Sequence, residues 1–281
     1  MSNFYVPQKD TYLLIDGDTI VYSVGFSPNL NVEGTPPAYI YHQVKNMLNS
    51  MIEAVPTEHV RIYLTSQDKS NFRFDVASTP GPGGQGYKAQ RGTTVPPIHK
   101  QMIRDYLVEE HRAQIVEGIE ADDMLVIQGT KYGRDATIAT FDKDLHMSPC
   151  HIYDIRKKLL MPYEYGNELG GLTLDIRETP SGKVKKKLIG RGIAWLYAQM
   201  LLGDTVDNIA GVPGCGDVGA YNLLKDLEIE NDYFNIVGGK YLDTFGEDYQ
   251  DRFLEIAQLL WMHTNKDRCI VKRWRGMGWI K

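Results

Sequence analysis

The first half of the chain alternates short apolar runs with longer segments in which apolar residues follow a helical period. The apolar runs predict strands at residues 12–15, 60–65, 114–117, 137–141 and 152–153. Between the first two runs, Val44, Leu48 and Ile52 recur at the spacing of an amphipathic helix, and residues 98–107 show the same period. Because strands and helices alternate, we expect an α/β fold with a mostly parallel sheet flanked by helices.

The second half of the chain begins with a change of character between residues 160 and 188. Gly-rich polar sequence, the alternating LTLDI and the basic SGKVKKKL predict a hairpin-like excursion in this stretch. Helical patterns follow at residues 194–202, 220–227 and 253–262. The predicted organisation is therefore an α/β core at residues 1–160, the excursion at 161–190 and a helical region at 191–281.

A Gly- and Pro-rich stretch, STPGPGGQG at residues 78–86, interrupts the α/β core. Its composition excludes regular secondary structure and predicts a mobile loop, or a spacer between the sheet and a segment that moves. The basic sequence YKAQR follows directly. Positive charge is therefore placed immediately after the stretch that we expect to be most adaptable.

Composition narrows the class of protein. The chain has 281 residues and is 42% apolar, which is enough for a sizeable core and excludes disorder as the main state. Its three cysteines are far apart, which excludes a disulfide framework and favours a reducing compartment. With no secretion signal or membrane span in the sequence, we expect a cytoplasmic protein. The net charge of -5 does not by itself favour a polyanionic partner. Whether the protein binds a polyanion must therefore be judged from where its charges lie along the chain.

Acidic residues follow the predicted strands. Asp16, Asp68, Glu120 and Asp142 each come shortly after an apolar run. The carboxyl ends of parallel strands lie along one edge of a sheet, so we expect these carboxylates to converge there. Such a cluster repels itself unless protons or cations neutralise it. Oxygen ligands without His or Cys indicate Mg²⁺ or Mn²⁺ rather than zinc.

Local patterns enlarge the acidic set. GIEADD, FDKDLH and GDTVDN each supply a pair of acids, and the candidate metal ligands become Asp16, Asp68, Glu120, Asp122, Asp123, Asp142, Asp144, Asp204 and Asp207. Any one of them can be a helix cap or a turn residue, the role we assign to Asp18 and Asp217. The whole set predicts two neighbouring cations, the usual means of hydrolysing a phosphodiester, and so favours a nuclease.

The segment GVPGCGDVGAYNLL at residues 211–224 has the rhythm of a helix-hairpin-helix element. Gly211, Gly214 and Gly216 allow tight turns, so that amides can face a phosphate and carbonyls can hold a monovalent cation such as K⁺. Contacts of this kind position a nucleic acid without reading its sequence. The alternative is a Gly-rich turn with no ligand.

Cations and an aromatic side chain follow the Gly-rich stretch. Tyr87 could stack on a base, Lys88 could reach a phosphate, and Arg91 lies one helical turn further on. Lys100 and Arg104 on the next predicted helix are candidate DNA contacts, with a solvated basic face as the alternative. The same two alternatives hold for the basic run at residues 183–187.

Taken together, these motifs resemble the 5′-nuclease family, which includes flap endonucleases, the 5′-nuclease domain of bacterial DNA polymerase I and the exonucleases of T-odd bacteriophages. The resemblance covers nearly the whole chain. Its carriers are LLIDGD (13–18), QDKSNFR (67–73), YKAQR (87–91), GIEADD (118–123), TFDKDL (140–145) and GDTVDNIAGVPGCG (203–216). The closing AQLLWMHTNKDRCIVKRW is similar to the tail of the short phage exonucleases, which makes these the preferred subgroup.

The resemblance implies a PIN-like core and a role for each candidate residue. Asp16, Asp68, Glu120 and Asp122 would form a first metal site; Asp142, Asp144, Asp204 and Asp207 would form a second, and Asp123 would act through water. Lys88 would neutralise the scissile phosphate with help from Arg91, and Tyr87 would contact DNA near the cut. The Gly-rich stretch and residues 98–110 would form an arch that admits a single-stranded 5′ end.

The expected function is that of a divalent-metal-dependent 5′-3′ exodeoxyribonuclease that also cuts 5′ flaps, in phage DNA replication or repair. RNA removal from RNA–DNA hybrids is a plausible side activity, and we expect a monomer without a sliding-clamp partner. One alternative is a PIN-type endoribonuclease, which has no need of a helix-hairpin-helix grip. Another is a structure-specific DNA-binding protein without catalysis.

Overall fold

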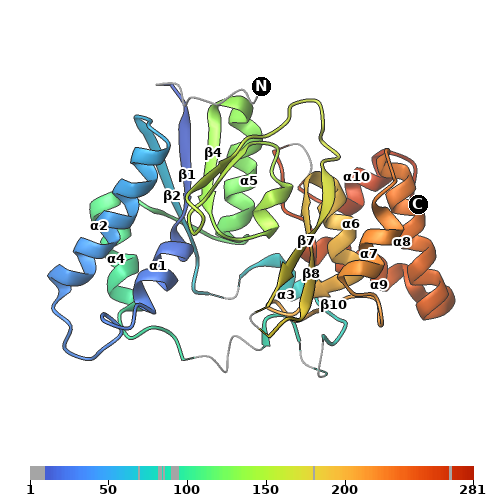
Figure 1. Cartoon of the computed structure of the whole chain (residues 1–281), viewed down its shortest axis with the longest axis horizontal. Coiled ribbons are helices and arrows are strands. Elements are labelled where there is room, and N and C mark those ends of the chain that lie inside the picture. The colour runs from blue at the N-terminus through green and yellow to red at the C-terminus, as the bar shows by residue number, and fades with distance from the viewer. Residues whose placement is uncertain are drawn as a thin grey trace. The chain divides into compact units, whose positions relative to one another are not determined.

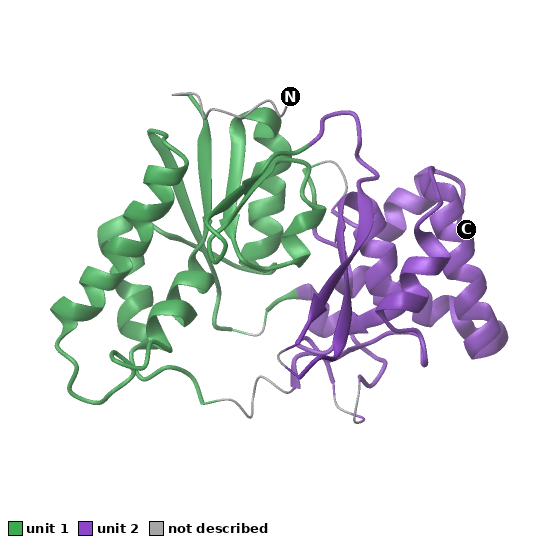
Figure 2. Cartoon of the chain, in the orientation of Figure 1, with its two compact units in different colours: residues 1–71, 95–163, 263–266 green, residues 72–94, 164–262, 267–281 purple. Residues whose placement is uncertain are grey.

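The computed structural model describes residues 10–68, 70–81, 84, 86–89, 95–179, 181–265 and 268–281. Its contacts divide the chain into two compact units (Figure 2). Unit 1 comprises residues 1–71, 95–163 and 263–266, and unit 2 comprises residues 72–94, 164–262 and 267–281. Each unit is thus assembled from segments that are distant in the sequence. The three segments predicted from the sequence stay a prediction.

Unit 1 is built on a six-stranded sheet with the order β3-β2-β1-β4-β5-β6 (Figure 1). Its strands are β1 (Tyr12–Asp16), β2 (His59–Thr65), β3 (Gln114–Val116), β4 (Ala136–Thr140), β5 (His151–Asp154) and β6 (Leu159–Met161). Neighbouring strands from β3 to β5 pair in parallel, and β6 pairs antiparallel with β5. The mostly parallel sheet predicted from the apolar runs is therefore confirmed.

Helices pack on the sheet of unit 1. They are α1 (Gly17–Gly25), α2 (Pro37–Ala54), α4 (Lys100–His111) and α5 (Ala121–Tyr132), with short 3-10 turns η3 (Gly133–Asp135) and η4 (Asp144–Met147). Leu13 and Ile15 belong to a core cluster with apolar residues of α1, α2 and α4. Leu14, between them, is fully buried outside that cluster, and α5 contacts β1, β2 and β4. Successive side chains of β1 point to opposite faces of the sheet, so β1 packs against helices on both faces.

Unit 2 combines a hairpin with a set of helices. Its elements are α3 (Phe72–Val76), β7 (Gly171–Glu178), β8 (Val184–Arg191), α6 (Gly192–Leu202), β9 (Gly203–Asp204), β10 (Ile209–Ala210), α7 (Asp217–Leu224), α8 (Glu230–Phe245), η5 (Gly246–Asp248), α9 (Tyr249–Leu260) and α10 (Ile270–Gly276). Helix α6 is buried almost throughout and contacts α7, α8 and α9. An aromatic cluster of Phe234, Phe253 and Trp274 joins α8, α9 and α10.

Two features of the fold differ from the sequence-based expectations. Helix α4 was assigned to an arch, but Ile103 and Leu107 are fully buried in the core of unit 1. The apolar period of this helix reflects packing on the sheet, so any arch ends before α4. Helix α8 was not predicted, because Gly238 and Gly239 in its middle conceal a helical pattern. In the described part of the chain, no helix is long and apolar enough to cross a membrane.

Candidate active site

Three of the predicted acids stand at the carboxyl edge of the sheet in unit 1. Asp16 ends β1 and is the N-cap of α1, Glu120 follows β3 as the N-cap of α5, and Asp142 follows β4. These strands run parallel, so their carboxyl ends lie along the same edge. Strand order reverses direction around β1 and β4, which is where open α/β sheets bind their ligands.

Asp16 is a buried carboxylate with a strongly raised pKa. Its oxygens accept hydrogen bonds from the Thr19 backbone N–H at 2.9 Å and from the Thr140 hydroxyl at 3.1 Å. Burial, together with the nearby charges of Asp18 and Asp142, raises the pKa of Asp16 to about 6, despite the hydrogen bonds from Thr19, which lower it. A bound cation would reverse this effect by stabilising the charged form, and the all-oxygen donors suit Mg²⁺ or Mn²⁺.

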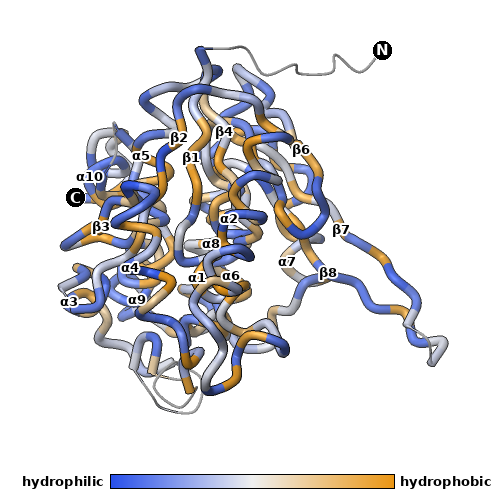
Figure 3. Tube along the Cα trace, turned by 90° about the vertical axis from the view of Figure 1, so that its left-hand side faces the viewer, coloured by the Kyte–Doolittle hydropathy of each residue, from blue (hydrophilic) through white to orange (hydrophobic). Residues whose placement is uncertain are grey.

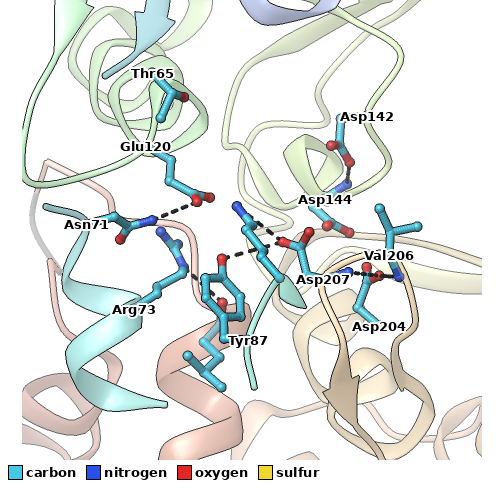
Figure 4. Close-up of polar contacts among 12 residues, drawn as sticks. Thr65, Asn71, Arg73, Tyr87, Glu120, Asp142, Asp144, Asp204, Val206 and Asp207 are labelled. Carbon is cyan, nitrogen blue, oxygen red and sulfur yellow. Dashed lines mark hydrogen bonds and ion pairs between the residues drawn. The ribbon is translucent and has the colours of Figure 1, made fainter. Parts of the chain in front are cut away.

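Glu120 and Asp123 form a capping box at the start of α5. The Asp123 carboxylate accepts the Glu120 backbone N–H at 3.2 Å and the His263 backbone N–H at 3.0 Å. Asp123 is fully buried, so its two oxygens serve the backbone rather than the water-mediated metal contact that we expected. Glu120 accepts a 2.6 Å hydrogen bond from Asn71, which orients its side chain (Figure 4).

The remaining acids of unit 1 are Asp142 and Asp144 after β4, Asp122 in the first turn of α5, and Asp68 after β2. Asp142 accepts the backbone N–H of Asp144 at 2.9 Å, and Asp144 forms an ion pair of 2.7 Å with Lys143 (Figure 4). Asp122 is half-buried on α5. Asp68 is exposed, and hydrogen bonds from its neighbouring serine hydroxyls hold its pKa below the ordinary value. None of these four acids is fully buried, so water can reach each of them.

Two predicted assignments in unit 1 are corrected by the structure. Asp18 was assigned to helix capping, but its carboxylate accepts the Thr65 backbone N–H at 2.9 Å and pairs with Arg104 at 3.0 Å. Arg104 was a candidate DNA contact, yet it is buried and also donates to the Thr65 carbonyl at 2.7 Å. Its guanidinium therefore holds α4 against β2. Lys100 lies over the Tyr22 ring, 5.6 Å from the ring centre, at the surface.

In unit 2, Asp204 and Asp207 lie in the turn between β9 and β10. The Asp204 carboxylate accepts the backbone N–H of Val206 at 2.7 Å and of Asp207 at 3.3 Å, which folds the turn around one carboxylate (Figure 4). Asp204 is buried, whereas the side chain of Asp207 is directed to Lys88 and Tyr87. The prediction that both acids share a metal with Asp142 and Asp144 stays a prediction.

Lys88 and Tyr87 both contact the carboxylate of Asp207. The Lys88 ammonium lies 3.5 Å from the Asp207 carboxylate and the Tyr87 hydroxyl donates to it at 3.4 Å (Figure 4). The Lys88 backbone N–H also donates to the Asp207 carbonyl at 2.8 Å, with Lys88 in the left-handed region at φ 54°. Tyr87 is buried and packs edge-on against Phe74, so the expected stacking on a base is replaced by an internal contact. Arg91 lies outside the described residues.

The described part of the Gly-rich stretch makes hydrogen bonds to other segments of unit 2. Glu255 on α9 accepts backbone and hydroxyl hydrogen bonds from Ser78 and Thr79. Gly81 lies so close to Asn208 that an added Cβ would overlap its carbonyl oxygen. Asn208 donates from its side-chain amide to the Gly86 carbonyl at 2.8 Å. The expectation of a mobile loop or a spacer stays a prediction.

The predicted helix-hairpin-helix sequence folds as helix α6, the β9-β10 pair, a turn and helix α7. Gly211 packs on the backbone of Gly203 so closely that a Cβ would come within 2.4 Å of its nitrogen. Gly214, at φ 76°, and Gly216, the N-cap of α7, have open space where a Cβ would stand. Asp217, assigned to capping, instead accepts the Leu188 backbone N–H at 2.7 Å.

Sequence reasoning missed Asn71, Asn208 and Glu255, all of which orient candidate site residues or their segment. Asn71 and Asn208 lie inside recognised motifs, which was the available signal, whereas Glu255 lies on a helix far from any motif. Among the residues that the structure describes, no three carboxylate, imidazole or thiol groups are close enough to enclose a cation. The two predicted ligand sets therefore stay predictions.

Comparison with known proteins places the chain in a family. No family model matches it. It is 30% identical over 240 residues to the 5′-3′ exonuclease of Buchnera aphidicola subsp. Baizongia pistaciae, covering 80% of this chain and 70% of the relative. It is 27% identical over 237 residues to DNA polymerase I of Bacillus caldotenax, of which it spans only 24%.

A solved structure confirms the fold. The T5 D15 protein co-crystallised with metal ions superposes with a TM-score of 0.51 at 15% identity, covering 89% of this chain and 88% of that protein. This likeness supports the PIN-like core expected from the motifs. By its relationship to the Buchnera exonuclease and by its fold, the chain belongs to the 5′-nuclease family.

Proposed function

We propose that the chain is a divalent-metal-dependent 5′-3′ exodeoxyribonuclease that also cuts 5′ flaps. The observation that carries the proposal is the placement of Asp16, Glu120 and Asp142 at one edge of a parallel sheet. The relationship to a protein named 5′-3′ exonuclease supports the reaction, and the DNA polymerases among the relatives support DNA as the substrate. A role in phage DNA replication and a monomeric state belong to the same proposal.

The metal ligands of the proposal come from both units. In unit 1, Asp16, Asp68, Glu120 and Asp122 would hold one cation, and Asp142 and Asp144 would contribute to another. In unit 2, Asp204 and Asp207 are the remaining ligands. Mg²⁺ or Mn²⁺ bound there would supply an activated water and stabilise the leaving oxygen of the phosphodiester. Thr19, Thr140 and Asn71 orient the carboxylates with their hydrogen bonds.

Lys88 supplies positive charge from the protein itself. Its ammonium, now 3.5 Å from Asp207, would bind a non-bridging oxygen of the scissile phosphate and stabilise the charge that develops there. Tyr87 and the backbone bond to Asp207 keep this lysine in place. Arg91 assists in the same proposal. Hydrolysis would leave a 5′-phosphate and a 3′-hydroxyl.

The turn before α7 would hold the DNA backbone. Gly214 and Gly216 leave their backbone open to solvent, so amides can face a phosphate, and carbonyls can bind K⁺. Gly211 acts indirectly, because its close packing on Gly203 sets the direction of the turn. Lys100 at the surface of unit 1 is the remaining candidate contact. RNA–DNA hybrids offer the same phosphates and are proposed as secondary substrates.

The proposal is tested with a 5′-flapped duplex labelled at its 3′ end, incubated with Mg²⁺ or EDTA. We expect wild-type protein to cut near the junction only with metal. Asp142→Asn should lose more than about 100-fold in rate, because it removes a predicted ligand. Lys88→Ala should lose about 100-fold, because it removes a transition-state cation.

Asp243→Asn, an exposed aspartate on α8, is the matched control and should keep wild-type activity. Cutting of RNA but not DNA would replace the proposal with an endoribonuclease. Binding of the flap without cutting in Mg²⁺ or Mn²⁺ would indicate a DNA-binding protein without catalysis. Full activity of Asp142→Asn would contradict the metal assignment.

A further inference from the structure

The β7-β8 hairpin carries cations on one of its two faces. In its antiparallel register, Arg177 lies opposite Lys185 and Asp175 lies opposite Lys187. Directly opposed residues, and residues two apart on one strand, share a face of the ribbon. Arg177, Lys185 and Lys187 therefore stand together, which we call the cationic face. The two lysines are exposed, and the distal part of the hairpin extends away from the helices of unit 2 (Figure 3).

Two of the three cations on the cationic face have no acidic partner among the residues that the structure describes. Asp175 is the acid on this face, and it pairs with Arg177 at 2.6 Å. Within the described part of the chain, neither Lys185 nor Lys187 forms an ion pair. Arg177 and Lys185 are directly opposed like charges, an arrangement that destabilises a strand pair. An anionic partner would remove this repulsion.

The opposite face has a different character. Ile176 lies opposite Lys186, and Glu178 lies opposite Val184, so this face carries one cation and one acid beside two apolar side chains. Ile176 and Val184 are both largely exposed. A lipid surface would favour apolar and cationic side chains on the same side of the ribbon. Because the cations are gathered on the other face, the distribution fits a polyanion better than a membrane.

The base of the hairpin is fixed to the helices that follow it. Leu188 is buried, and its backbone N–H donates to Asp217, the first residue of α7. Gly190 lies against the Trp195 ring of α6, where an added Cβ would come within 2.4 Å of a ring carbon. The base of the hairpin therefore has a fixed position beside the turn that contains Gly216. This turn is the one that we propose to bind DNA phosphates.

We propose that the cationic face binds the sugar-phosphate backbone of duplex DNA, as an extension of the contact made by the α7 turn. This inference rests on the proposed function for its choice of DNA as the polyanion. The hairpin would contribute affinity without sequence preference, because lysine and arginine contacts to phosphate position a duplex and do not read its bases.

The test compares two double variants with equal loss of charge. Lys185→Gln with Lys187→Gln removes two cations from the hairpin, and Lys45→Gln with Lys131→Gln removes two exposed cations from α2 and α5. Binding of a fluorescent flapped duplex is followed by anisotropy in EDTA, which prevents cutting, at about 50 to 200 mM salt. We expect the hairpin variant to lower the slope of log affinity against log salt by about 1.8, and the control to keep the wild-type slope.

An unchanged slope in the hairpin variant, with a wild-type thermal melt, would overturn the inference, and so would an equal loss in the control. Tighter binding to phosphatidylserine vesicles than to the duplex would identify a lipid surface instead. The proposed function is read separately from cutting in Mg²⁺. If wild-type protein cuts DNA but the hairpin variant keeps the wild-type salt slope, only the inference about the hairpin fails. If the salt slope falls in the variant but wild-type protein never cuts DNA, only the proposed function fails.

Discussion

Buried polar side chains fix the backbone around Lys88. Asn208 is almost completely buried, donates to the Gly86 carbonyl, and has a left-handed backbone at φ 58°. Asparagine tolerates this conformation better than most residues because its short polar side chain bonds locally. Arg73, fully buried on α3, donates to the carbonyls of Leu259 and Trp261. Single side chains therefore set the path of whole segments in unit 2.

Asn208 allows backbone strain and hydrogen bonding to be separated. Asn208→Gly keeps the left-handed conformation without strain but loses the bond to Gly86, whereas Asn208→Ala loses the bond and adds strain. We expect the glycine variant to be more stable than the alanine variant by about 1 kcal/mol in chemical denaturation. Both variants should lose about 10- to 100-fold in kcat with little change in KM, because Lys88 is no longer held in position.

Equal stability of the two variants would contradict the strain argument. Unchanged kcat in both would show that the contact with Gly86 does not position Lys88.

At the scale of elements, helix α9 anchors the segment that leads to Lys88. Burial alone would raise the pKa of Glu255, but the hydrogen bonds from Thr79 and Ser78 outweigh burial and hold the pKa below its ordinary value of 4.5. The folded protein therefore binds this proton less readily than the unfolded chain. Glu255 stabilises the fold fully above pH 4.5, and that contribution is lost as pH falls through the lowered pKa.

We expect Glu255→Gln to lower the free energy of unfolding by about 1–2 kcal/mol at pH 7, because charge-assisted hydrogen bonds are lost. The difference from wild type should shrink as pH falls below 4.5, since the wild-type carboxylate then becomes protonated. Urea denaturation at a series of pH values measures this, with the exposed Glu247→Gln as a control that should show no such difference. A gap that is constant over pH would refute the assignment.

Elements with one dominant physical signal could be predicted from the sequence, and others could not. Apolar runs in the sequence predicted the buried strands β1, β2 and β4, and a continuous apolar segment predicted helix α6. The role of α4 could not be read from its period, because an amphipathic helix looks the same in an arch and on a sheet. The position of Asp16, Glu120 and Asp142 at one edge of the sheet could be predicted because each follows a buried strand. Glu255 was missed because its partners are 176 and 177 residues away in the sequence.

At the scale of the molecule, the parallel sheet concentrates negative charge at one edge of unit 1. The raised pKa of Asp16 shows that this charge is unfavourable in the absence of a cation, since burial and the neighbouring Asp18 and Asp142 oppose ionisation. Ion binding to the folded state alone would convert this repulsion into stability. Catalytic competence and stability are thus expected to depend on the same ions.

We expect Mg²⁺ or Mn²⁺ to stabilise the wild-type protein by about 2.7 kcal/mol at a hundredfold excess over its Kd. The thermal melting temperature should rise with metal and return to the starting value in EDTA. Asp142→Asn should show a smaller rise, and sodium chloride at matched ionic strength should not reproduce the wild-type effect. The assignment fails if the salt alone gives the same rise as Mg²⁺.

The hydrogen bond between Asp123 at the start of α5 and His263 affects when this part of the fold can form during synthesis. Asp123 receives the backbone N–H of His263, and residues 263–266 belong to unit 1 although all its other residues precede 164. On the ribosome, the helix start that carries Glu120 remains open until residue 263 has emerged. A nascent chain cannot complete this acidic edge before most of unit 2 has been synthesised. The order of synthesis therefore delays the completed acidic edge until residue 263 has been added.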